Sequence, residues 1–158
     1  MKRLLNFEMI PKTAWYDNVR SRVSHVEWEY IRANVMKGRC QYCGRRDGLF
    51  CHEVWEYNNY TQKLVGFETV CFLCNCVHHI GLAEILAQRG ELDWNELVRH
   101  YCVVNNCTRR DFQEDREEAV RVWLERSQHD WELDLSYLEW AVRLKKPILM
   151  SVTNVVDI

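Results

Sequence analysis

The hydrophobic and polar positions of the chain first fall into a regular pattern at Ser24. The spacing Ser24-x-x-Glu27 is that of a capping box, in which each side chain bonds the other residue's backbone N–H at the start of a helix. The pattern predicts a helix over residues 24–37 that ends at Gly38. Its buried side would be formed by the apolar residues at helical spacing, Val26, Trp28, Tyr30, Ile31 and Val35.

Two strand-like runs follow this helix. Residues 49–57 and 64–71 are rich in aromatic and branched side chains, and Asn58-Asn59 between them is a turn signal, so the sequence predicts an antiparallel hairpin. A short helix is expected at residues 75–79, with Gly81 as its stop. The predicted order is therefore strand, strand, helix.

The pattern beyond Gly81 is mainly helical. Helices are predicted over 82–88, 93–101, 108–127 and 137–146, a strand over 131–135, and an edge strand or packing segment over 148–158. A hairpin among helices places the protein in the α+β class. We expect one compact unit with three parts: an N-terminal basic arm and helix (1–37), a core (38–81) and a C-terminal helical extension (82–158).

Four cysteines bracket the predicted hairpin as two Cys-x-x-Cys pairs. Cys40 and Cys43 precede the first strand, and Cys71 and Cys74 follow the second. Four thiolates at this spacing suit one tetrahedral zinc ion, with each pair forming a tight knuckle. The alternative is four unrelated buried or disulfide-linked cysteines, which the two matching pairs make the weaker interpretation.

Composition favours a folded protein with reduced cysteines. The 158 residues include seven Trp and seven Tyr, and 47% are hydrophobic, which argues against a disordered chain. Because the first residues lack the apolar run of a signal peptide, and no stretch of about twenty apolar residues occurs, we expect a cytoplasmic protein without a membrane partner. The remaining cysteines are expected to be buried core residues, namely Cys51, Cys76, Cys102 and Cys107, although the last two, as a Cys-x4-Cys pair, have a weaker claim as metal ligands.

Charge is unevenly distributed along the chain. The net charge is −2, yet residues 1–46 hold ten Lys and Arg against four Asp and Glu. This basic part, where Arg20 and Arg22 lie close in sequence to Trp15 and Tyr16, could contact nucleic-acid phosphates. It could equally be a solvated mixture of charges or an arm packed on the core. The acidic remainder of the chain is better suited to a protein partner.

A second metal site is the main candidate for catalysis, because zinc held by four thiolates has no open position with which to activate water. His52, Asn75 and His79 are its candidate ligands, since residues four apart share a helix face and a strand residue can face that helix. A Mg²⁺ or Mn²⁺ ion there could bind a scissile phosphate, with Glu53 or His52 as the general base. Alternatively, His52 only hydrogen-bonds a thiolate or carbonyl. We expect His78 at the surface or in a supporting contact.

At these residues the sequence resembles the HNH endonuclease superfamily, whose ββα-metal motif is often built on a treble-clef zinc site. The segments CHEVWEY (51–57) and LVGFETVCFLCNCVHHIGLA (64–83) are similar to a bacterial and phage subgroup with the pattern CHE-W-YD, then L-G-x-x-x-L-C-x-x-C-H-x-x-x-H-x-G-x-A. The resemblance covers about residues 11–138. It implies a treble-clef core with structural zinc at Cys40, Cys43, Cys71 and Cys74 and a second metal at His52 and His79.

Two departures from the family pattern concern the amide and glycine positions. Asn75 stands where the usual His follows the second Cys-x-x-Cys pair, although Asn is itself a metal ligand in some HNH nucleases. Gly66 occupies the place of the middle Asn, for which Asn58 or Asn59 could substitute in space.

The third departure is on the first strand, where many members have two His or Asp then His. Aligning the family's following apolar residue with Val54 puts His52 on the metal position and Glu53 on the base position. Aligning His52 with the base instead would put Cys51 on the metal position. We prefer the first alignment.

These observations lead to hypotheses of different classes. The first is an HNH-type endonuclease that hydrolyses DNA with a catalytic Mg²⁺ or Mn²⁺. The second is a catalytically degenerate HNH-like zinc module, phage-encoded as the resemblance to that subgroup suggests, that binds a host protein or nucleic acid without cutting. A third is a zinc-stapled structural or regulatory protein. The sequence leaves the oligomeric state open.

Overall fold

The computed structural model describes residues 2–142, and this part of the chain divides into two compact units. Unit 1 combines residues 2–11, 37–50 and 69–128, and unit 2 combines residues 12–36, 51–68 and 129–142. Each unit has its own cluster of buried side chains. The α+β class is confirmed, because a three-stranded mixed sheet occurs together with seven α-helices in the described residues. The predicted three-part division along the chain stays a prediction.

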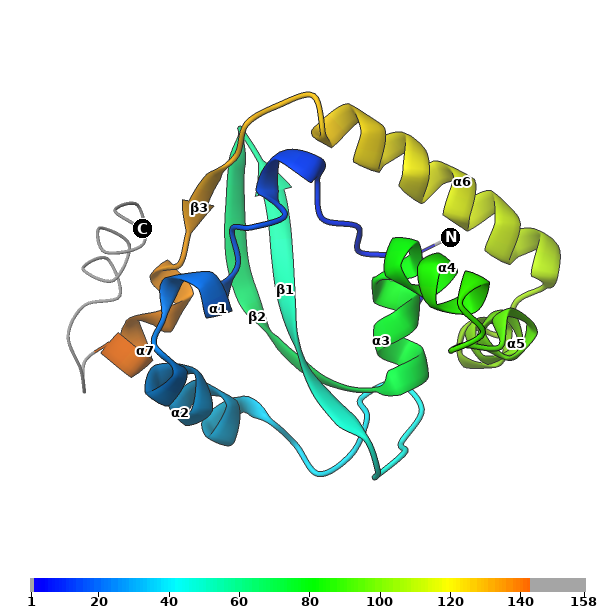
Figure 1. The fold of residues 1–158 in the computed structure, drawn as a ribbon, viewed down its shortest axis with the longest axis horizontal. Helices are drawn as coiled ribbons and strands as arrows, with labels where there is room; N and C mark the ends of the chain where they lie inside the picture. Colours follow the sequence, from blue (N-terminus) through cyan, green and yellow to red (C-terminus); the bar gives the residue numbers. More distant parts are fainter. Residues whose placement is uncertain (1, 143–158) are drawn as a thin grey trace. The chain divides into compact units, whose positions relative to one another are not determined.

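The predicted hairpin is present. Strand β1 (Leu49–Asn58) is joined to β2 (Thr61–Cys71) by Asn59 and Tyr60, both at positive φ, as a tight two-residue hairpin turn requires (Figure 1). Because the turn is so short, β2 begins three residues earlier than the sequence predicts. The predicted strand near residue 133 is also present: β3 (Glu132–Asp134) pairs with β2 in parallel, with Thr61 opposite Glu132.

Unit 1 is mainly helical. It contains α3 (Phe72–His78), which starts directly at the end of β2, followed by α4 (Ile80–Gln88), α5 (Trp94–Asn105) and α6 (Arg109–Arg126) (Figure 1). Thr108 caps α6 in the predicted capping box. The predicted stop at Gly81 is wrong, because the break between α3 and α4 lies two residues earlier, at His79 (ψ 55°), and Gly81 continues α4.

The N-terminal segment of unit 1 packs on the last two of these helices. Leu5 is fully buried, and the ring of Phe7 stacks on Tyr101 of α5 with 5.0 Å between centroids. Arg3 pairs with Asp111 and Asp115 of α6, and Tyr101 donates a hydrogen bond to the same Asp115 carboxylate. Residues 3–7 therefore form a packed arm, which bears out that alternative for the start of the basic part alone.

Unit 2 surrounds a smaller core built on the hairpin. Its elements are η1 (Lys12–Ala14), α1 (Val19–Arg22), α2 (His25–Val35), η2 (Ser136–Leu138) and α7 (Glu139–Val142). The Ser24–Glu27 capping box is confirmed at the start of α2. Trp28 and Ile31 are buried, but the prediction for Val26 is wrong: it is 67% exposed, because it lies on the other side of the helix from the stripe of residues 28, 31 and 35.

The C-terminal predictions are only partly covered. The helix predicted over 137–146 corresponds to η2 and α7 as far as residue 142, and the segment predicted over 148–158 lies outside the described residues. Among the described helices, none has the length and apolar character needed to cross a bilayer.

Candidate metal centre

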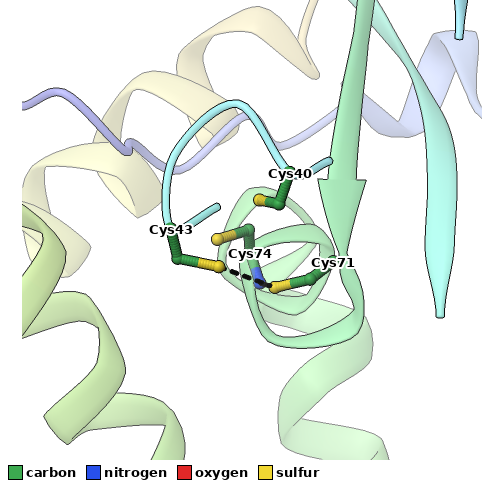
Figure 2. Close-up of side chains that lie close together, drawn as sticks. All are labelled: Cys40, Cys43, Cys71 and Cys74. Atoms are coloured by element: carbon green, nitrogen blue, oxygen red, sulfur yellow. Dashed lines mark hydrogen bonds between the residues drawn. The ribbon is translucent and has the colours of Figure 1, made fainter. Parts of the chain in front are cut away.

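The four predicted zinc ligands lie together in unit 1. Cys40 and Cys43 come from the loop before β1, Cys71 ends β2, and Cys74 lies in the first turn of α3, with the four side chains turned toward a common centre (Figure 2). Their sulfur atoms all lie within 4.8 Å of one another. Cys40, Cys71 and Cys74 are buried, whereas Cys43 is exposed. The structure therefore brings together the whole set that the sequence predicts.

The geometry of this cluster fits a tetrahedral zinc ion. Four Zn–S bonds of about 2.3 Å hold their sulfurs about 3.8 Å apart. The sulfurs of Cys43 and Cys71 are already 3.5 Å apart, and none of the eight cysteines forms a disulfide, so the alternative of disulfide-linked cysteines is wrong. Hydrogen bonds from the Cys74 thiol and from His100, opposed by burial, lower the pKa of Cys71 below its ordinary value. This favours the thiolate form of Cys71, whereas burial raises the pKa of Cys43.

The first knuckle is held to the end of β2 by backbone hydrogen bonds. Within the knuckle, Cys40 N–H donates to the Arg45 carbonyl (2.8 Å), and Gly44, at φ 78°, donates to the Cys40 carbonyl (3.0 Å). Gln41 N–H donates to the Thr69 carbonyl, and Thr69 N–H donates back to the Gln41 side chain (2.8 Å). The predicted use of Gly44 is therefore confirmed, and a short hydrogen-bond network helps to position the cysteines of the two pairs.

His100 is a residue of this centre that sequence reasoning missed. Its Nε2 atom, on α5, lies 3.1 Å from the sulfur of Cys74. In the tautomer with a proton on Nε2, the ring donates a hydrogen bond to the sulfur, as outer-sphere groups commonly do at zinc sites. The available signal was weak: His100 lies three residues after the buried Leu97, on the inward side of an amphipathic helix.

His100→Ala is expected to speed the loss of zinc about 10-fold, because removal of an outer-sphere hydrogen bond commonly weakens metal binding by at least that factor. The measurement is the rate at which zinc passes from the folded protein to a chromogenic chelator. His100→Gln, whose amide can still donate, should restore part of the difference. Arg99→Ala, an exposed neighbour on α5, is the control. Equal rates for His100→Ala and Arg99→Ala would contradict this role.

In unit 2, the predicted residues His52 and Glu53 lie on opposite faces of β1, because successive strand side chains alternate. His52 is 4% exposed, and one of its ring nitrogens lies within 4.8 Å of a carboxylate oxygen of Glu68. Glu68 is a second residue that the sequence analysis missed; its signal is an acidic residue near the apolar end of β2.

Glu53 faces α1. The backbone N–H groups of Val19 and Arg20 donate to its carboxylate, as free N–H groups in the first turn of a helix commonly do. Burial nevertheless outweighs these bonds and raises the pKa of Glu53 to about 7. A carboxyl group that titrates near neutral pH can accept a proton, but this one is bound to the helix on the other face of the strand from His52.

In unit 1, Asn75 and His79 are both half-buried. Their similar exposure is expected, because residues four apart share one helix face. Of the two alternatives for His78, the surface position is wrong, because the side chain is fully buried. Its Nδ1 lies 2.9 Å from the Asn6 carbonyl and 3.8 Å from a Glu8 carboxylate oxygen. The N-terminal segment covers this side of α3, which the local sequence around His78 does not reveal. His52 belongs to unit 2, so the predicted second-metal set stays a prediction.

The other cysteines are consistent with the core role expected of them. Cys51 and Cys76 are buried, and Cys102 and Cys107 are partly buried against the core of unit 1.

Comparison with known proteins adds no relative. No family model matches the chain, and no curated protein or solved structure matches it. The four-cysteine centre within a strand–strand–helix segment is consistent with the HNH resemblance.

Proposed function

We propose that the protein is an HNH-type metal-dependent endonuclease that hydrolyses DNA phosphodiester bonds. The observation that carries the proposal is the four-cysteine cluster, which ties a knuckle to the end of a hairpin strand and to the first turn of the helix that follows it. This is the order of elements expected of a ββα-metal motif built on structural zinc. The cluster supports the sequence resemblance, because the four cysteines of the family pattern meet at one possible metal site.

The proposed roles divide between two metals. Zinc at the four cysteines closes its coordination sphere and serves the fold. His52, Asn75 and His79 would hold a Mg²⁺ or Mn²⁺ ion, which when bound supplies charge stabilisation for the scissile phosphate and the leaving oxygen. Glu53, whose pKa is raised to about 7, is the proposed acceptor of the proton from the attacking water.

One observation favours the second candidate function, a degenerate HNH-like module that binds a host protein or nucleic acid without cutting. Glu53 is bonded to the backbone of α1 and lies on the other strand face from His52. A base and a metal ligand that serve one phosphate must lie near each other, so this arrangement suits a structural role for Glu53. If Glu53 is structural and Asn75 replaces a metal-binding His, the protein would keep its zinc site but would lack catalytic activity.

Nicking of supercoiled plasmid in added Mg²⁺ or Mn²⁺ tests the two functions. The wild-type protein, stripped of loosely held metal but retaining zinc, should nick only when metal is added. His52→Ala and His79→Ala should lower the rate at least about 100-fold, as is typical when a metal ligand or proton-transfer group is lost. His25→Ala, at an exposed position on α2, should behave like the wild type.

Two results would decide against the nuclease. One is a folded wild type that holds one zinc per chain and never nicks. The other is nicking that persists unchanged in both His variants, which would point to a contaminating enzyme. If only Asn75→His nicks, the ancestral function is a nuclease and this chain is the degenerate form.

A further inference from the structure

The zinc knuckle carries a pocket lined by cations. Its volume is about 540 Å³, and its walls are Lys37, Gly38, Arg39, Cys40, Gln41, Gly44 and Arg46, all in unit 1. Three of these side chains are positively charged and none is acidic. Arg45, also exposed, extends the basic surface along the same loop. We call Lys37, Arg39, Arg45 and Arg46 the knuckle cations.

The knuckle cations are available for an external partner. Within residues 2–142, none of them forms an ion pair with a carboxylate. Other basic residues of the N-terminal part are engaged within their own units: Arg3 with Asp111 and Asp115, Arg22 with Asp17, and Arg20 over the ring of Trp28 at 4.7 Å. The positive excess of residues 1–46 therefore includes a free group of charges at the zinc knuckle.

The backbone beneath these charges is fixed. Thr69, which is 1% exposed, accepts from the N–H of Lys37 through its side chain (2.7 Å) and from the N–H of Gln41 through its carbonyl (2.9 Å). Cys40 lies between them and belongs to the four-cysteine cluster. A backbone that is already held in place loses little further freedom on binding, which favours binding of an anion by these side chains.

We propose that the knuckle cations form a binding surface for the phosphodiester backbone of DNA. The inference rests on the proposed function, since it identifies the surface on which a DNA substrate would be held. Unpaired Arg and Lys on an open surface, without acidic neighbours in the pocket, match the sequence-independent electrostatic contact by which proteins hold DNA. In this arrangement the knuckle cations position the DNA, and other residues carry out the chemistry.

The test is binding of a fluorescently labelled 20-bp DNA duplex, measured by anisotropy without Mg²⁺ or Mn²⁺ at 50 and 200 mM salt. Arg39→Gln/Arg46→Gln should weaken binding about 10-fold at the lower salt concentration. It should also reduce the slope of log K against log[salt] by about 2, because each lost phosphate contact contributes close to one. Arg99→Gln/Arg110→Gln makes the same change of charge at exposed positions in unit 1 and should leave both values unchanged. Zinc content and circular dichroism establish that both variants are folded.

Each outcome separates this inference from the nuclease proposal. Loss of binding in the knuckle variant without any plasmid nicking by the wild type supports the surface and rejects the enzyme. Nicking by the wild type with equal DNA binding in both double variants rejects the surface and leaves the enzyme. Absence of DNA binding by the wild type, or equally tight binding of poly-glutamate, overturns the inference.

Discussion

Cys71→Ser is expected to abolish zinc binding and to cost unit 1 several kcal/mol of stability. The side chain is fully buried between strand β2 and helix α3, and its loss would leave three thiols around an incomplete site. Zinc contributes about 10 kcal/mol or more to isolated zinc fingers, and small domains are stable by only about 5–15 kcal/mol. The measurements are zinc content per chain and thermal unfolding followed by circular dichroism.

The matched control is Cys76→Ala, on helix α3, which begins directly after Cys71. Cys76 is also buried but lies outside the four-cysteine cluster, so we expect one zinc per chain and a loss of about 1 kcal/mol, that of a small apolar truncation. Stripping zinc from the wild type with a strong chelator should reproduce the unfolding of Cys71→Ser. If Cys71→Ser keeps one zinc and an unchanged melting temperature, the cluster is not a structural metal site.

The four-cysteine cluster could be predicted because its signal is local. Two residues separate the cysteines of each pair, and the hairpin between the pairs has a turn signal, so chain geometry alone returns Cys71 to Cys40. The helices that begin with a capping box were also predicted well, at Ser24 and Thr108, because the cap is specified within four residues. Gly81 failed as a stop because glycine permits a break without requiring one.

The parts that could not be predicted depend on contacts between distant segments. His78 is buried because the N-terminal segment, about 70 residues earlier, packs over it, and His100 reaches Cys74 across 26 residues of sequence. The pairing of β3 with β2 likewise joins residues about 70 apart. Neither hydrophobic period nor residue spacing reports such contacts, and for the same reason the meeting of His52 with residues of α3 stays a prediction.

Glu53→Gln is expected to stabilise the protein at high pH and to have little effect at low pH. The folded-state pKa of Glu53 is raised from 4.5 to about 7 by burial. A raised carboxyl pKa contributes stability that is fully present below pH 4.5 and is lost as the pH rises through 7, because the folded state must then hold a buried charge. A difference of this size corresponds to roughly 3 kcal/mol between pH 4.5 and pH 9.

Urea unfolding of wild type and variant at pH 5 and pH 9 measures this effect. Relative to the wild type, Glu53→Gln should gain roughly 3 kcal/mol between the two pH values. Its amide oxygen can still accept from the backbone N–H groups of Val19 and Arg20, so the first turn of α1 keeps its partner. Glu56→Gln, at an exposed position on the same strand, should show no pH-dependent difference. If Glu53→Gln and the wild type differ equally at both pH values, Glu53 is ionised in the folded protein throughout this range. Its carboxylate would then be a weaker base than the proton acceptor proposed here for a nuclease at neutral pH.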